Sequence, residues 1–112
     1  MSADSIEALQ HLQEFGWRIH LYCAPGYPTR VEDVRLPLFG YTAQPRFAFH
    51  GLSSHCMDPR LPLAAVARGA KMIEMHFQLD DEPSELEANV SLTASQFRRM
   101  IDDVRAVETM LA

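Results

Sequence analysis

Three short apolar runs alternate with helix-like segments, and this alternation constrains the fold more than any other feature of the chain. The runs cover residues 17–23, 47–53 and 71–77 and are rich in aromatic and β-branched residues. Strands that alternate with helices predict parallel strands joined by right-handed crossovers. We therefore expect an α/β fold with about three parallel strands and flanking helices.

Capping signals mark the first and last predicted helices. Asp4 with Glu7, and Thr93 with Gln96, have the spacing of a capping box, in which two side chains satisfy free backbone donors. Gly16 is placed to end the first helix. The last helix carries a long apolar stripe at helical spacing, made of Phe97, Met100, Ile101, Val104, Val107 and Leu111.

The middle of the chain is less regular. Pro62 suits the first position of a helix that Gly69 ends. The connection at residues 27–44 predicts at most a helical turn or two, with Thr29 and Glu32 as candidate caps. One apolar face is expected on the helix that follows Pro62, made of Leu63, Val66, Ala67 and Ala70.

Three parallel strands do not make a complete sheet. Parallel sheets are normally covered on both faces, and an open sheet exposes two unpaired edges. The chain therefore needs further strands. It is expected to self-associate, to pair with another chain, or to be a piece of a larger barrel.

Composition narrows the class of protein. The 112 residues carry a formal net charge of -5, and no basic stripe is present to neutralise nucleic-acid phosphates. Cys23 and Cys56 are too few for a disulfide framework and are expected to be buried small hydrophobes. Neither a leader sequence nor a bilayer-spanning run is evident, so a cytoplasmic protein is the default expectation.

Polar residues follow the ends of the predicted strands. Tyr27 comes just after the first strand, His55 after the second, and His76 at the end of the third. Barrels of alternating strands and helices build their active sites at this edge. Two neutral imidazoles suit a divalent transition metal, and Glu74 lies on the same side of its strand as His76. The competing interpretation is that both histidines are structural hydrogen-bonding groups.

Other polar residues are interpreted as structural. His11, His20 and His50 are assigned to a helix surface or to strand interiors. The acidic run at 80–82 is expected to be a solvated loop. Solvated surface charge is likewise the preferred interpretation of Arg60, Arg68 and Lys71.

Several motifs then resemble one known family, the N-acetylneuraminate (sialic acid) synthases. Residues 21–29 (LYCAPGYPT) are similar to that family's "LhC…YPT", and 51–56 (GLSSHC) to its "GlSDHT". Residues 63–80 resemble "aAVAlGA..iEKHFTLD", and 91–108 resemble "SLeP.EF..mv..iR..E". The opening at 1–9 resembles a segment that follows an inner strand of the same barrel. The resemblance covers nearly the whole chain, in order and in register.

The resemblance implies a fold and a reaction. These enzymes are (β/α)8 barrels with a small C-terminal antifreeze-like domain. They condense phosphoenolpyruvate with an N-acyl-mannosamine-type sugar, release phosphate, and use Mn2+ or Mg2+ to polarise the sugar aldehyde. Matching positions assign metal binding to His55 and His76, substrate binding to Tyr27 and Ser53, and catalysis to Glu74 and Glu87.

Five positions depart from the family pattern. Ser54 replaces the aspartate of "SDH", and Met75 replaces the lysine of "EKH". Glu87 and Ala88 stand where the family has aspartate and histidine, and Pro25 replaces a polar residue. Mutation of a residue that orients a metal ligand typically lowers metal affinity or activity about 10–100-fold. The replacement of the family's aspartate by Ser54 removes such a residue beside His55.

Residues 1–112 are thus expected to form the C-terminal segment of a synthase-like barrel, without the antifreeze-like domain and without the half that carries the phosphate-binding lysines. Such a segment belongs to an enzyme whose barrel is completed by a longer polypeptide, by a partner chain that supplies the missing half, or by further copies of the same chain in a homo-oligomer. The alternative is a degenerate, non-catalytic half-barrel that assembles or binds sugar. An unrelated α/β domain is the third interpretation. The sugar, its acyl group and the preferred metal stay open.

Overall fold

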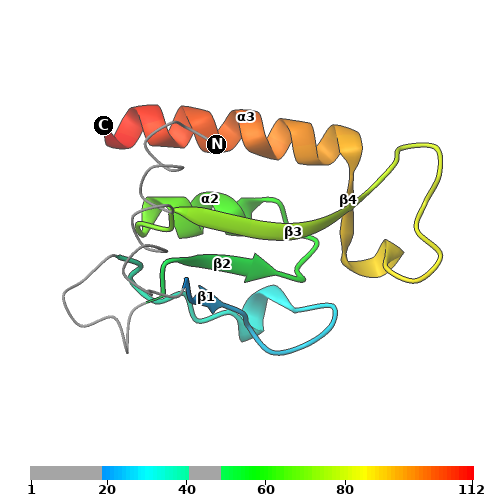
Figure 1. Ribbon diagram of the computed structural model, residues 1–112, viewed down its shortest axis with the longest axis horizontal. Coiled ribbons are helices and arrows are strands. Elements are labelled where there is room, and N and C mark those ends of the chain that lie inside the picture. Colours follow the sequence, from blue (N-terminus) through cyan, green and yellow to red (C-terminus); the bar gives the residue numbers. More distant parts are fainter. Residues whose placement is uncertain (1–18, 41–48) are drawn as a thin grey trace.

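The computed structural model describes residues 19–40 and 49–112, whose strands form one parallel sheet with helices on one face (Figure 1). The strand order is β1-β2-β3-β4, and each neighbouring pair is parallel. The strands are β1 (Leu21–Tyr22), β2 (Gly51–Ser54), β3 (Met72–Gln78) and β4 (Ser91–Thr93). The helices are α2 (Arg60–Ala67) and α3 (Ala94–Leu111), with 3-10 turns η1 (Val31–Asp33) and η3 (Ala88–Val90).

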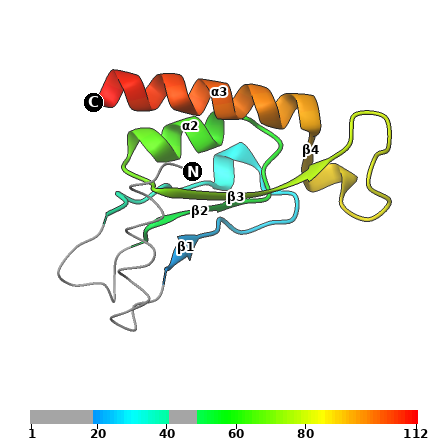
Figure 2. The ribbon, with the colours of Figure 1, turned by 45° about the horizontal axis from the view of Figure 1, so that its top comes forward.

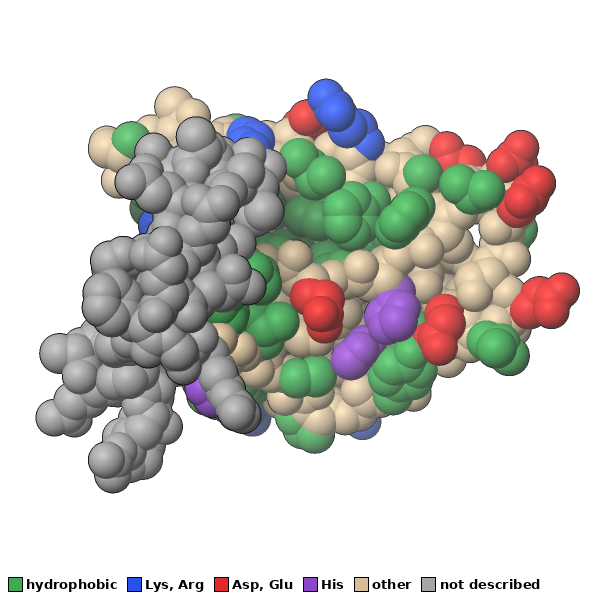
Figure 3. Space-filling model, viewed as in Figure 1, with side chains coloured by type: hydrophobic (Ala, Val, Ile, Leu, Met, Phe, Trp, Pro, Cys, Tyr) green, Lys and Arg blue, Asp and Glu red, His purple; other side chains and the backbone are tan. Residues whose placement is uncertain are grey.

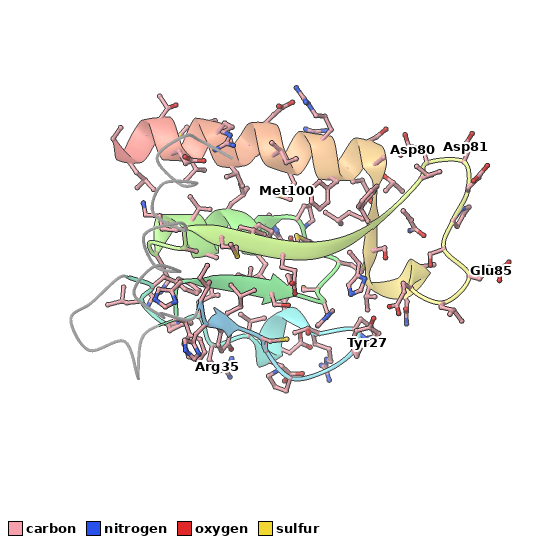
Figure 4. The ribbon with its side chains drawn as sticks, viewed as in Figure 1. Tyr27, Arg35, Asp80, Asp81, Glu85 and Met100 are labelled. Carbon is pink, nitrogen blue, oxygen red and sulfur yellow. The ribbon has the colours of Figure 1, made fainter. Side chains whose placement is uncertain are left out.

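Both α-helices lie on the same side of the sheet (Figure 2). The hydrophobic core lies between the sheet and α2, where Leu52 and Ala65 are fully buried against Phe39 and Ala70. Met100 is buried where α3 faces the sheet (Figure 4). The helices therefore cover one face, and the strand side chains of the other face are free to build a site.

Two glycines occupy positions that other residues fit poorly. A Cβ at Gly51 would lie 2.1 Å from the carbonyl oxygen of Met72 on the neighbouring strand. Gly69 follows α2 with φ +99°, a conformation that glycine adopts without strain. The expected helix end at Gly69 is confirmed, and Gly51 allows β2 and β3 to approach closely.

The expectation of three strands is wrong by one. β4 pairs with the end of β3, with His76 opposite Ser91 and Gln78 opposite Thr93. Three residues are too few to show a strand periodicity, and this segment runs directly into α3. The other strands are displaced or shorter than expected: β1 ends before Cys23, and β2 begins after His50.

The helix α2 differs from its prediction in where it begins and in which side chains it buries. The helix begins at Arg60, two residues before Pro62. Its buried residues are Pro62, Ala65 and Val66, whereas Ala67 is exposed. Of the expected apolar face, Val66 and Ala70 are buried, whereas Ala65 rather than Ala67 faces the core. Thr29 does not cap η1, because its hydroxyl donates to the Gly26 carbonyl at 3.0 Å.

The end of the chain matches its prediction more closely. Thr93 and Gln96 form the expected capping box at the start of α3. The apolar stripe is half-buried apart from buried Met100 and exposed Leu111. The predictions for 1–18, including the first helix and His11, lie outside the described residues, as does the part of the second apolar run at 47–48.

Candidate functional site

Three ring side chains meet toward the carboxyl end of the sheet: Tyr27 from the loop after β1, His55 directly after β2, and His76 on β3. The rings of Tyr27 and His55 have centroids 4.7 Å apart, and those of His55 and His76 are 5.4 Å apart. Tyr27 and His76 rings are 6.4 Å apart and nearly perpendicular. The sequence-predicted residues Tyr27, His55 and His76 are thus brought together.

The register of β2 and β3 explains the placement of the polar side chains. Ser53 lies opposite Glu74, and each is two residues before a histidine of the site. Because strand side chains alternate between faces, Ser53 and His55 share one face, as do Glu74 and His76. The Ser53 hydroxyl donates to Glu74 Oε1 at 2.7 Å. Figure 3 shows histidine side chains with acidic side chains on either side on the face turned away from α2.

A second carboxylate reaches the site from the loop after β3. Tyr27 donates a hydrogen bond from its phenol to Glu87 Oε2. The Ser84 hydroxyl accepts from the Glu87 backbone N–H at 3.0 Å, and the Ser91 hydroxyl donates to the Glu87 carbonyl at 2.6 Å. These bonds hold Glu87 just before η3. In Figure 4, Tyr27 lies at the end of the sheet toward the loop that carries Asp80.

The hydrogen bond changes the acidity of Tyr27. The pKa of its phenol is raised, first because the phenol donates to Glu87, then by partial desolvation and by the negative charge of the carboxylate. Ionisation would place a phenolate beside a carboxylate and remove the donor. Tyr27 is therefore held as a neutral donor at the mouth of the site, with 53% of its surface exposed.

Cys23 is a member of the site that the sequence interpretation missed. The expectation of a buried cysteine is wrong for this residue, because Cys23 is exposed and follows the end of β1. Its Sγ lies 3.5 Å from His55 Nδ1. One signal in the sequence could have found it: Cys23 ends the first predicted strand, four residues before Tyr27, and therefore lies at the same edge of the sheet.

Cys56 and Ser54 belong to the opposite side of this strand end. Cys56 is buried, as expected. The Ser54 hydroxyl is also buried and accepts from the Cys56 backbone N–H at 3.2 Å. Ser54 thus holds the turn that follows β2, and in this way it constrains the backbone that carries His55.

The donor set suits a metal only in part. Two imidazoles from adjacent strands are at ring-centroid distance 5.4 Å. Within residues 19–40 and 49–112, no three His, Cys, Asp or Glu side chains form a group that would enclose an ion. Two imidazoles alone do not enclose an ion, so a metal held by His55 and His76 would need further ligands.

The remaining histidines with described positions lie at the other end of the sheet. The Nδ1 atom of His50 accepts the backbone N–H of His20 at 3.0 Å. His50 is buried and His20 is exposed. Both make structural contacts away from the candidate site, as expected, but each lies one residue before its strand rather than inside it.

Comparison with known proteins decides the family. The sequence profile described as NeuB family matches residues 3–112. The chain belongs to the NeuB family. It is 37% identical over 93 residues to a pseudaminic acid synthase of Campylobacter jejuni, covering 83% of this chain and 27% of that protein. The resemblance to the sialic acid synthase family is thereby confirmed.

Other relatives also carry the names of sugar-acid synthases. Human N-acetylneuraminate-9-phosphate synthase is 32% identical over 93 residues, covering 81% of this chain and 26% of the human protein. An N,N'-diacetyllegionaminic acid synthase of Legionella pneumophila is 29% identical over 91 residues, covering 81% of this chain and 26% of that enzyme. These relatives are nonulosonic acid synthases by name.

This NeuB chain spans 25% to 32% of the length of the curated relatives that it matches.

Among the residues that the structure describes, no helix combines the length and the apolar character that a bilayer crossing requires. The family assignment rests on the sequence, and the site geometry is consistent with a cluster at the carboxyl ends of parallel strands.

Proposed function

We propose that this chain carries the sugar- and metal-binding part of a nonulosonic acid synthase active site. The reaction is the condensation of phosphoenolpyruvate with an N-acyl-mannosamine-type sugar. The terminal methylene carbon of phosphoenolpyruvate forms a carbon–carbon bond with the sugar aldehyde carbon, whose oxygen becomes a hydroxyl. Water adds to the neighbouring carbon that carries the phosphate, and phosphate leaves from that carbon to give the keto group. The observation that carries the proposal is the approach of His55 and His76 in a chain of the NeuB family.

His55 and His76 are the residues we assign to the divalent metal, Mn2+ or Mg2+. They come from adjacent strands and face the same side as Glu74 and Ser53. The chemistry that such an ion supplies is Lewis-acid polarisation of the aldehyde oxygen. The Cys23 thiol beside His55 Nδ1 fixes the orientation of that ring.

The resemblance implies substrate binding for Tyr27 and catalysis for Glu87; because the two side chains are hydrogen bonded, we assign both to the sugar. Both lie at the open end of the sheet and hydrogen bond to one another. A sugar hydroxyl between them would accept from the phenol and donate to the carboxylate, so each side chain exchanges one partner for another. Substrate binding therefore costs no unsatisfied polar group at this position.

Glu74 keeps the catalytic role that the resemblance implies, and Ser53, which the resemblance implies for substrate binding, is assigned here to positioning Glu74. The Ser53 hydroxyl fixes one carboxylate oxygen of Glu74 and leaves the other free. Glu74 is on the same strand face as His76, so its free oxygen points to the same space as the metal ligands. We assign Glu74 the transfer of a proton to or from the sugar oxygen.

We further propose that the four strands form the C-terminal part of a (β/α)8 barrel in a cytoplasmic enzyme. The support is that the strands are all parallel, with helices on one face and the polar cluster at the carboxyl edge. β1 and β4 are the outer strands of the described sheet and would each pair with a further strand. Those strands come from more chain, from a partner that supplies the missing half, or from a second copy.

Association is therefore expected of the chain studied alone. Light scattering of the purified 112 residues is predicted to give a mass above the 12.7 kDa of a single chain. A folded monomer would contradict the proposal that the outer strands require partners.

A non-catalytic sugar-binding module is the second candidate function. It is favoured by Ser54 and Met75, where the resembling family has aspartate and lysine. Met75 is half-buried on β3 and cannot supply a positive charge. On this account, metal and sugar bind but phosphoenolpyruvate is not consumed.

The two candidates are separated by phosphate release. The protein, purified with the polypeptide that completes the barrel, is incubated with Mn2+, phosphoenolpyruvate and N-acetylmannosamine. A synthase releases phosphate only when both substrates are present, and His76→Ala abolishes that release. His20→Ala, an exposed histidine at the other end of the sheet, is the matched control and retains it. Sugar binding without phosphate release would favour the second candidate.

A further inference from the structure

A cleft of about 710 Å³ lies on the helix-covered side of the sheet, between η1 and α2. Figure 2 shows η1 and α2 on that side. Ligand pockets in proteins commonly have volumes of about 300–1,000 Å³, so the cleft is large enough for a small molecule. It is distinct from the cluster of Tyr27, His55 and His76, whose strand side chains face the other way.

The cleft lies beside a crossover whose described part contains little helix. The β2-to-β3 crossover carries the eight-residue helix α2, whereas the described part of the β1-to-β2 crossover carries only the three-residue turn η1. A short turn fills less of the space beside α2 than a helix would. η1 ends at Asp33, and the chain is extended at Val34 before it reaches Pro37 and the buried Phe39.

The cleft is lined by apolar side chains, three arginines and one aspartate. The apolar lining residues are Val31, Val34, Leu36, Cys56, Leu61 and Ala64. The charged lining residues are Arg35, Asp58, Arg60 and Arg68. Apolar walls with a few polar groups are typical of sites for small organic ligands.

Asp58 neutralises one arginine of the cleft. Its carboxylate accepts from Arg60 Nε at 2.9 Å and from Arg60 Nη2 at 2.5 Å. The hydrogen bonds from Arg60 lower the pKa of Asp58 to about 2, so the carboxylate is ionised at neutral pH. The charge that remains in the cleft comes from Arg35 and Arg68.

Backbone carbonyls, rather than carboxylates, hold these two guanidinium groups. Arg35 Nη1 donates to the carbonyls of Glu32 and Val34 at 2.7 and 2.8 Å. Arg68 Nε donates to the Pro37 carbonyl at 3.0 Å. None of the ion pairs found among residues 19–40 and 49–112 includes Arg35 or Arg68. Each guanidinium is thus positioned and keeps further N–H donors and its full positive charge.

We propose that this cleft binds a small organic anion, a carboxylate or phosphate monoester on an apolar body. The anionic group pairs with Arg35 and Arg68, and the apolar body packs against Leu61 and Ala64 of α2. Guanidinium groups pair with both kinds of anion through two parallel hydrogen bonds. Cys56 belongs to both the cleft lining and the turn that carries His55, so the ligand lies next to the backbone of the candidate site.

Binding is tested on the whole chain by calorimetry with defined probes. 2-Naphthoate and 1-naphthyl phosphate present an anion on an apolar body, and 2-naphthalenemethanol is the neutral analogue. Inorganic phosphate tests the anion alone. We expect at least one naphthyl anion to bind more tightly than the alcohol and than inorganic phosphate. The better of the two anions identifies the headgroup.

Variants locate the site. Arg35→Gln and Arg68→Gln are each expected to weaken the anion about tenfold or more, since hydrogen bonds to charged groups are the strong ones. Arg99→Gln, an exposed arginine of α3 outside the cleft, is the matched control and leaves affinity unchanged. Because Arg68 also ties α2 to Pro37, Ala64→Trp provides a second route, in which an exposed helix position is enlarged to fill the cleft and abolish binding.

The circular dichroism spectrum and melting temperature establish that each variant is folded. No binding of either naphthyl anion to the wild-type chain would overturn the proposal. Equal affinity for the neutral alcohol would overturn it too. So would affinities that Arg35→Gln and Ala64→Trp leave unchanged in folded protein.

Discussion

Tyr27 donates a hydrogen bond to Glu87, a residue 60 positions away, and so joins the loop after β1 to the loop after β3. The bond lies over the carboxyl ends of the strands, where the Tyr27 ring also contacts His55. Two loops that come from different crossovers are thereby fixed relative to the histidine pair. The polar cluster is built by tertiary contacts between segments, none of which would form it alone.

The first prediction concerns the acidity of Tyr27. Glu87→Gln should lower the Tyr27 pKa toward its ordinary value of about 10, because the carboxylate charge and its strong acceptor are removed. Ultraviolet absorbance titration measures this, and the difference from Tyr27→Phe isolates Tyr27 from the other tyrosines. Since the folded pKa is raised, the contact stabilises the fold below the unfolded pKa and is lost as pH rises through the folded value.

Glu85→Gln is the control for this titration. Glu85 is an exposed carboxylate of the same loop and lies two residues from Glu87. It should leave the Tyr27 pKa where the wild-type chain has it. If Glu85→Gln and Glu87→Gln gave the same curve, the hydrogen bond would not be the cause of the shift.

A second prediction concerns acid sensitivity at the other end of the sheet. Burial lowers the pKa of His50 below 6.5, and His20 lowers it further. The folded chain thus favours neutral His50, while the unfolded chain takes up a proton near pH 6.5. Stability is fully present above that value and is lost as pH falls from it toward the lower folded pKa.

His50→Asn tests the origin of this acid sensitivity. The asparagine oxygen replaces Nδ1 as the acceptor for the His20 backbone N–H, which lies 3.0 Å away, and it does not titrate. The loss of melting temperature between pH 7.5 and pH 5.5 should be smaller in His50→Asn than in the wild-type chain. An unchanged pH dependence would show that other groups control it.

The helix α3 supplies a third prediction. Thr93→Ala removes the side chain that accepts from the Gln96 backbone N–H and should destabilise the chain by about 1 kcal/mol. Thr93→Ser keeps the hydroxyl and should differ little from the wild-type chain. Urea denaturation measures both. Equal stability of the alanine and serine variants would mean that the capping box contributes nothing.

Local signals in the sequence predicted the elements that are governed by local physics. The capping box of Thr93 and Gln96 involves residues three apart and formed as expected. Gly69 ends α2 because its conformation is a property of that residue. The clustering of His55 and His76 also followed, since the carboxyl ends of neighbouring parallel strands share one edge of the sheet.

Features that depend on distant packing were not predictable in this way. β4 is three residues long and is a strand only because it pairs with His76, Phe77 and Gln78. Cys23 is exposed because β1 ends at Tyr22, earlier than its apolar neighbours suggested. In α2, Ala65 rather than Ala67 faces the core, where it packs with Phe39 and Leu52 from other segments. The cleft beside α2 is lined by residues from η1, α2 and the segments next to them, so it too depends on tertiary packing.

Calorimetric titration of the chain with Mn2+ shows whether His55 and His76 together bind a divalent metal. We predict saturable binding that His55→Ala and His76→Ala each abolish, with the circular dichroism spectrum unchanged. His20→Ala should bind as the wild-type chain does. Manganese affinity that survives in His76→Ala, or a folded wild-type chain that binds no Mn2+, would rule out a metal site at this histidine pair.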